Sequence, residues 1–174
     1  TSASVTRNAD VISLGGTLLN TLLARPYSIY YQIGSVEQAT ASGFRRFISD
    51  NATAQHLGDR EASANTVGLF NGTDNLNATM PGGTTFSDSN APYKIAMGAD
   101  SSGRSLVAQN GTLVTDALNT MLTAYTGLYL GSDYAGGAGS FHDGYFQRLA
   151  VWNTRLSDAQ LQELTYTPPT PPTV

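Results

Sequence analysis

Short runs of apolar residues alternate with clusters of turn-forming residues along most of the chain, a pattern typical of an all-β protein. In the run YSIYYQI, the odd-numbered residues from Tyr27 to Ile33 are aromatic or aliphatic and share one face, because successive side chains of a strand point to opposite sides. The same alternation in FRRFIS places Phe47 and Ile48 on opposite faces. Similar runs predict strands over residues 44–49, 65–70, 93–99, 105–109, 112–116 and 127–132. Short strands that recur about every 8–12 residues predict an antiparallel β-sandwich.

Turn residues between these runs predict hairpins. Asn110-Gly111 separates the strands predicted at 105–109 and 112–116, and Asn-Gly favours a two-residue type I′ turn with positive φ at both positions. Asn71-Gly72 is a second candidate for such a turn. The segment from Asp100 to Gly103 predicts a longer hairpin loop.

One short helix is predicted near the C-terminus. Ser157 is a natural N-cap and Gln160 stands three residues later, which completes a capping box. Leu156 and Leu161 are spaced for the hydrophobic staple that accompanies such a cap. We expect this helix to pack on the sheet and to cover Trp152, which we interpret as a core residue.

The chain divides into a domain over residues 1–166 and a proline-rich tail over residues 167–174. Proline clusters favour extended backbone and form semi-rigid spacers, so the tail is either disordered or a linker to a further domain, and we favour the linker. Residues 15–25 fit a second short helix or a strand with turns, and the leucine spacing does not decide between them.

The composition excludes several classes of protein. Charged residues make up 13% of the chain, against ~25% in average globular proteins, and lysine occurs once, at Lys94. A net charge of -4 argues against a nucleic-acid binder, which needs a basic surface to meet phosphates. There are no cysteines, which removes disulfides and thiolate chemistry. No apolar run approaches the ~20 residues of a membrane span.

Several landmarks in the chain resemble those of laminin G-like modules of the concanavalin A-like lectin and glucanase superfamily. YKIAMGADSSGRSLVAQNG is similar to that family's strand, loop, strand and Asn-Gly hairpin. The closing segment of this chain resembles the closing segment of that family at four landmarks, Gly131-Ser132, Gly144, Trp152-Asn153 and Leu156-Ser157. The opening TRNADVISLGG also resembles the start of such modules in virion proteins of tailed bacteriophages. Residues 35–90 match only in general character.

This resemblance implies a jelly-roll sandwich of two antiparallel sheets, with a concave face or a rim of loops available for binding. Many members of the family bind carbohydrate or protein, some through calcium, and a few relatives hydrolyse glycans. In phages, such modules contact host surface glycans or other virion proteins.

The residues argue against catalysis. Glycoside hydrolysis needs two carboxylic acids that flank one bond, and the family's hydrolases carry a Glu-x-Asp-x-x-Glu strand. The glutamates here, Glu37, Glu61 and Glu163, lie far apart and none stands in such a strand. A nucleophilic triad would need His56 or His142 as its base, and neither is near a Gly-x-Ser-x-Gly elbow. We therefore expect no enzyme activity.

Calcium is the metal that this chain could bind. Asp50 and Asn51 follow a predicted strand at an expected rim of the sandwich, and carboxylate and amide oxygens suit a hard cation. The alternative is that these residues only form a turn, as Asn and Asp often do.

Aromatic rings that stack on sugars, together with polar groups that bind hydroxyls, would form a glycan site. The alternative for each aromatic residue is packing in the core. The candidate ligand-binding residues are Tyr30, Arg45, Arg46, Tyr129, Tyr134 and Phe141.

The function predicted from these observations is a non-catalytic, lectin-like module of a phage virion protein that recognises host cell-surface glycan. The alternative is a structural domain that decorates or assembles a capsid or tail fibre, and a glycoside hydrolase is a weaker one. The expected partners are a glycan, other virion proteins and a second copy of the chain. The expected location is a virion surface or the extracellular space, without nucleic acid or membrane insertion.

Overall fold

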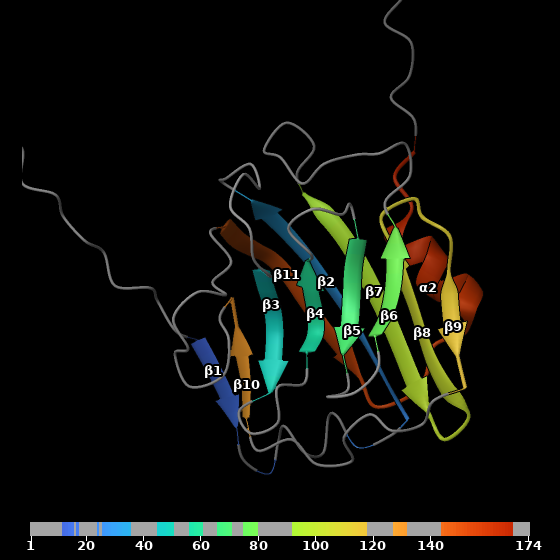
Figure 1. The fold of residues 1–174 in the computed structure, drawn as a ribbon, viewed down its shortest axis with the longest axis horizontal. Coiled ribbons are helices and arrows are strands. Elements are labelled where there is room, and N and C mark those ends of the chain that lie inside the picture. The colour runs from blue at the N-terminus through green and yellow to red at the C-terminus, as the bar shows by residue number, and fades with distance from the viewer. Residues whose placement is uncertain are drawn as a thin grey trace, which may run out of the picture.

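The fold is a sandwich of two antiparallel sheets with one helix on the outside (Figure 1). It is seen in a computed structural model that describes residues 12–15, 17, 24, 26–35, 45–50, 56–60, 66–70, 75–79, 92–117, 127–131 and 144–168. The antiparallel β-sandwich and the short C-terminal helix predicted from the sequence are confirmed.

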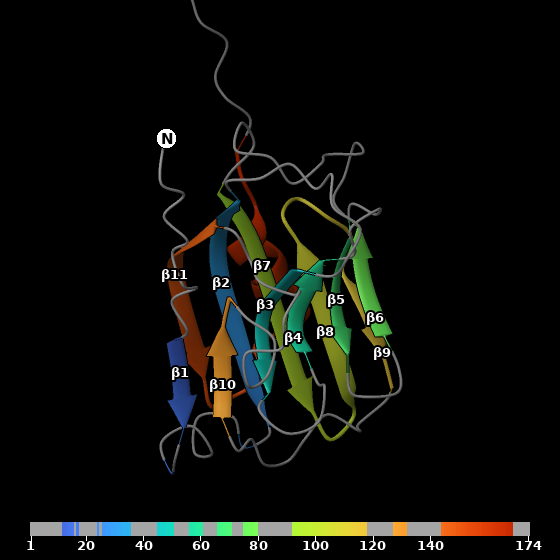
Figure 2. The same cartoon turned by 60° about the vertical axis from the view of Figure 1, so that its left-hand side comes forward.

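The sheets contain six and five strands in the part of the chain that the structure describes. The six-stranded sheet has the order β1 (Ile12–Gly15), β10 (Gly127–Leu130), β3 (Arg45–Asp50), β4 (His56–Arg60), β5 (Thr66–Phe70) and β6 (Asn75–Thr79). The five-stranded sheet has the order β11 (Gly144–Trp152), β2 (Tyr27–Ser35), β7 (Tyr93–Asp100), β8 (Gly103–Ala108) and β9 (Val114–Asp116). Figure 2 shows the two sheets face to face, with the helix α2 (Asp158–Thr165) on the outer side of the five-stranded sheet.

The core lies between the sheets and is built around β2. Its odd-numbered residues from Tyr27 to Ile33 are almost completely buried, as the alternation predicts. The Tyr31 ring packs against Phe47 of the opposite sheet and Phe146 of β11, with ring centroids 6.1 and 6.4 Å apart. Full burial of such side chains stabilises a fold by about 1.5–3 kcal/mol each.

A second apolar cluster joins α2 to the outer face of the five-stranded sheet. Leu161 of the helix is fully buried against Tyr30, Ala96 and Val107. Trp152 is half-buried and packs in the same cluster as the helix, as predicted, but it belongs to this outer cluster and not to the core between the sheets. Leu156, just before the helix, and Leu164, in its last turn, pack in the same cluster.

A polar network fixes the start of the helix to the hairpin of β7 and β8. Arg155 forms ion pairs with Asp100 at 3.2 Å and with Asp158 at 2.9 Å. The Ser105 hydroxyl is fully buried and donates to Asp158 Oδ1 at 3.0 Å. Hydrogen bonds between charged groups are among the strongest in proteins and depend on direction. This network therefore fixes the orientation of the helix start, which the apolar contact of Leu161 alone would not.

The hairpin between β7 and β8 is tighter than the sequence suggested. Asp100 and Gly103 are directly paired, so only Ser101 and Ser102 lie between the strands, and the expectation of a longer loop was wrong. Asp100 Oδ1 accepts hydrogen bonds from the backbone N–H of Ser102 at 2.7 Å and of Gly103 at 3.2 Å. This local capping by aspartate makes the short turn feasible.

The Asn110-Gly111 pair does not form the predicted type I′ hairpin. β8 ends at Ala108 and β9 begins at Val114, and only Asn110 of the pair has a positive φ, at 52°. Asn110 instead anchors the chain after the helix, because its N–H donates to the Thr165 carbonyl and its side chain accepts from the backbone N–H of residue 167. The Asn71-Gly72 pair lies outside the described residues, between two strands that do pair, β5 and β6.

The prediction that Phe47 and Ile48 lie on opposite faces of their strand was also wrong. Phe47 and Ile48 are both buried in the core, since the register between β3 and β4 shifts between Arg46 and Ile48. A bulge of this kind adds a residue to one strand and turns the following side chains over.

Most of the segment 15–25 lies outside the described residues, so the choice between helix and strand there stays open. After α2 the described chain continues to Pro168, and the boundary at residue 166 stays a prediction. Among the described helices, none is long and apolar enough to cross a membrane.

We expect Ser157→Ala to lower the free energy of unfolding by about 1 kcal/mol, because Gln160 N–H would lose its acceptor at the helix start. Urea denaturation measures the change. Ser157→Asp keeps an acceptor and is the control, and equal losses in the two variants would contradict the role of the cap.

We expect Asp100→Asn to lower stability at neutral pH and to have little effect in acid. The backbone N–H of Ser102, helped by the charge of Arg155, holds the pKa of Asp100 below its ordinary value, although burial acts in the opposite sense. A carboxyl whose pKa is lower in the folded state stabilises above its unfolded pKa of about 3.9, and this contribution disappears as the pH falls through the folded pKa. Urea denaturation of both proteins from pH 7 to pH 2 tests this, and a difference that stays constant with pH would contradict it.

Candidate functional site

The outer face of the six-stranded sheet carries a row of residues from all of its strands. Cross-strand pairing places them side by side at one level of the sheet. In strand order the row is Ser13, Tyr129, Ser49, His56, Phe70 and Asn75. The strand neighbours Leu69, Leu76 and Leu128 point into the core, so the row belongs to the outer face.

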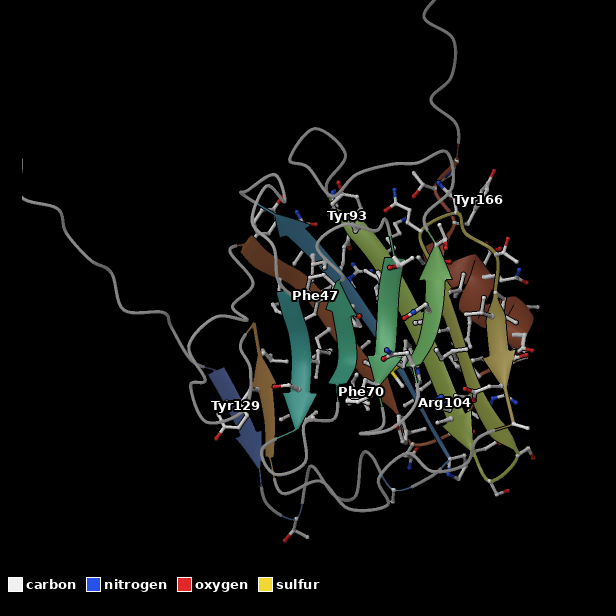
Figure 3. The ribbon with its side chains drawn as sticks, viewed as in Figure 1. Phe47, Phe70, Tyr93, Arg104, Tyr129 and Tyr166 are labelled. Carbon is white, nitrogen blue, oxygen red and sulfur yellow. The ribbon has the colours of Figure 1, made fainter. Side chains whose placement is uncertain are left out.

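The two aromatic residues of the row stand near its opposite ends. Tyr129 on β10 and Phe70 on β5 are both half-buried (Figure 3). They are three strand spacings apart, which corresponds to about 14 Å. Ser49 between them is fully buried. Beyond Phe70, Asn75 and Asn77 of β6 are exposed.

The candidate arginines, Arg45 and Arg46, lie on β3 a few residues before Ser49, the β3 member of this row. Arg46 stands opposite Asp59, in a second row that continues through Gly68 to Asn77. Arg45 stands opposite Arg60. The fold therefore brings Tyr129 and the Arg46 position to neighbouring strands, while the side chains of both arginines lie outside the described residues.

Tyr30 does not belong to an exposed site, which corrects the expectation from the sequence. It does point away from the sandwich core, but it is 5% exposed because Leu161 of α2 packs on it. Its hydroxyl lies 3.5 Å from Gln32 Oε1. Burial raises the pKa of Tyr30, while the positive charge of Arg148 acts in the opposite sense.

The remaining candidate residues have side chains outside the described residues. Asp50 ends β3 opposite Leu128, and its side chain lies outside the described residues. Asn51, Tyr134 and Phe141 also lie outside them. Within the described part, no three carboxylate or histidine side chains come together to hold a metal. The calcium site is therefore still a prediction.

The outer face of the five-stranded sheet has exposed residues that the sequence reasoning missed. Tyr145 on β11 is 43% exposed, and Tyr166 after α2 is 51% exposed. Arg148 is exposed on the same face as Tyr145, because the register shifts between Phe146 and Arg148. The sequence held a signal for this bulge, since the apolar positions change from even to odd numbers between Phe146 and Leu149.

No family model and no curated protein matches the sequence. The fold, in contrast, is similar to many solved structures. A Ruminococcus gnavus IT-sialidase CBM40 bound to α2,3-sialyllactose is 14% identical, with a TM-score of 0.61 over 86% of this chain and 86% of that one. The same module bound to α2,6-sialyllactose is 17% identical, with a TM-score of 0.58 over 84% and 86% of the two chains.

Larger proteins contain similar domains. A Trypanosoma rangeli sialidase is 11% identical, with a TM-score of 0.62 over 83% of this chain and 23% of that one. A mutant NanB sialidase from Streptococcus pneumoniae is 12% identical, with a TM-score of 0.61 over 91% of this chain and 27% of that one. This chain therefore spans about a quarter of each sialidase. These likenesses show that it has the β-sandwich fold of the CBM40 modules.

We expect Tyr30→Ala to lower the free energy of unfolding by about 3–5 kcal/mol, as loss of a buried aromatic ring generally does. Tyr30→Phe keeps the ring and should cost little, because among the described residues its hydroxyl makes one long contact, to Gln32. Denaturant unfolding of both variants measures this. A fully stable Tyr30→Ala variant would contradict the packing against Leu161.

Proposed function

We propose that this chain is a non-catalytic carbohydrate-binding module that recognises a cell-surface glycan through the outer face of its six-stranded sheet. The observation that carries the proposal is the cross-strand row with Tyr129 and Phe70 about 14 Å apart and neutral polar residues beside them. That spacing suits a short oligosaccharide better than a single sugar.

The chemistry of this face supports a sugar ligand. Aromatic rings pair a large apolar surface with a fixed geometry, which matches the apolar face of a pyranose. The amides of Asn75 and Asn77 can both donate and accept hydrogen bonds, as sugar hydroxyls require. Neutral amides also cost less to desolvate than charged groups do.

The structural neighbours support the same ligand class. The Ruminococcus gnavus module was solved with sialyllactose in two linkages, and it matches this chain over most of both lengths. We propose that this chain shares the use of the fold for glycan binding.

The described carboxylates support binding without hydrolysis. A glycosidase needs an acid and a second carboxylate free to act on one bond. Asp116 is paired with the buried Arg104, and Asp100 and Asp158 are paired with Arg155. Glu163 lies exposed on α2, remote in sequence and fold from the row.

We place this activity outside the cell, either on a virion or on a bacterial surface. The resemblance of TRNADV to the start of tailed-phage modules supports a virion protein that contacts host glycan. Asp50 and Asn51 are proposed calcium ligands near the end of β3, so binding is to be measured with and without calcium.

We expect the chain to bind a subset of glycans on an array of host polysaccharides and oligosaccharides, and Tyr129→Ala to weaken that binding about tenfold, as expected for loss of a stacking ring. Tyr166→Ala is the matched control, because it removes an equally large and more exposed tyrosine from a different surface. Melting temperatures of both variants show whether the fold is kept.

Absence of binding to any glycan, with and without calcium, would contradict the proposed function. Equal losses in Tyr129→Ala and Tyr166→Ala would contradict the placement of the site on the six-stranded sheet.

A further inference from the structure

A compact group of residues occupies the outer face of the five-stranded sheet, beside the helix. We call it the β11–β2 patch, and it comprises Tyr145, Arg148, Gly34, Gln32 and Lys94. Tyr145 is paired with Gly34, Arg148 with Gln32, and Gln32 with Lys94, so they occupy adjoining positions on three neighbouring strands. The row from Arg148 to Lys94 spans two strand spacings, about 10 Å, which suits one sugar residue.

Tyr145 provides a ring held against the sheet. A Cβ atom placed on Gly34 would lie 2.2 Å from Tyr145 Cζ and 2.5 Å from its hydroxyl oxygen. The end of the ring therefore crosses the Gly34 backbone, which only a residue without a side chain allows. Because Tyr145 is still 43% exposed, the ring is both supported by the sheet and open to solvent.

Arg148 provides a positive charge that no described carboxylate neutralises. Arg104 and Arg155 are each paired with carboxylates, and the Lys94 ammonium donates to the Tyr166 carbonyl at 2.8 Å. Arg148 is exposed and forms no ion pair within the residues that the structure describes. The bulge after Phe146 is what turns it to the same face as Tyr145.

Gln32 provides an oriented amide between the two cations. Its Oε1 lies 3.5 Å from the Tyr30 hydroxyl, which leaves the Nε2 hydrogens for an acceptor outside. Arg148 is the cross-strand partner of Gln32, so the two residues stand side by side on the outer face.

The geometry points to a second binding site, specific for a carboxylated sugar residue, on the β11–β2 patch. The apolar face of the pyranose packs on the Tyr145 ring, the Arg148 guanidinium binds the carboxylate through two parallel hydrogen bonds, and the Gln32 amide donates to a hydroxyl. The inference rests on the proposed function in taking the ligand to be a saccharide. The site itself lies on the opposite side of the sandwich from Tyr129.

The test is a titration of the full chain, labelled with ¹⁵N, and observed by NMR. The carboxylated probes are α2,3-sialyllactose and digalacturonic acid, and lactose is the neutral counterpart of the first. Both carboxylated probes should shift the amide signals of Gln32, Gly34 and Arg148, whereas lactose should not. Rising salt should weaken the binding, because the carboxylate contact is ionic.

Substitutions separate the ring from the charge. Arg148→Gln should weaken binding of the carboxylated probes about tenfold. Gly34→Ala adds one methyl group that displaces the Tyr145 ring, so it should weaken binding more than Tyr145→Phe, which keeps the ring. Gln162→Ala changes an exposed residue of α2 outside the patch and is the control. It should leave both the binding and the melting temperature unchanged.

Three results would overturn the inference. The first is that neither carboxylated probe binds, which leaves the proposed function intact if a neutral glycan binds and Tyr129→Ala weakens the binding of that glycan. The second is that the carboxylated probes bind, but Tyr129→Ala weakens them and Arg148→Gln does not. The third is that a polyglutamate peptide displaces the sugars at equal concentration, since the patch would then recognise negative charge alone.

Discussion

The burial of one face of the strands in the core between the sheets is the constraint on which the rest of this structure depends. In that core Tyr31 packs against Phe47 of the opposite sheet and Phe146 of the neighbouring strand. A ligand can therefore reach only the alternate, outward residues of each sheet. Register and bulges decide which these are, because a shift of one residue exchanges the two faces.

The helix α2 then divides the outer face of the five-stranded sheet. Leu161 covers Tyr30, Ala96 and Val107, while Arg155 and its carboxylate partners hold the start of the helix in place. Tyr145 near the start of β11 stays exposed. The packed helix thus makes Tyr30 unavailable to a ligand. The β11–β2 patch lies beside the helix and stays available.

The described exposed residues of the two sheets differ in chemistry. On the six-stranded sheet, the described exposed residues of β6 are neutral amides and a threonine, which suit sugar hydroxyls. On the five-stranded sheet, Arg148 is exposed with no carboxylate partner among the described residues. With only 13% charged residues in the chain, few other charges are present to compete with this guanidinium.

The sequence by itself determined the features that depend on neighbouring residues. The alternation of β2, the sandwich class, the capping box at Ser157 and the cover over Trp152 follow from side-chain direction and local hydrogen bonds. Only the tertiary structure decided that Tyr30 is buried, because its cover comes from a helix far along the chain. It also aligned Tyr129 with Phe70, and Arg148 with Tyr145, since these depend on the register of distant strands and on a bulge. Local patterns specify which way a side chain points from its strand, whereas packing between distant segments decides what, if anything, covers it.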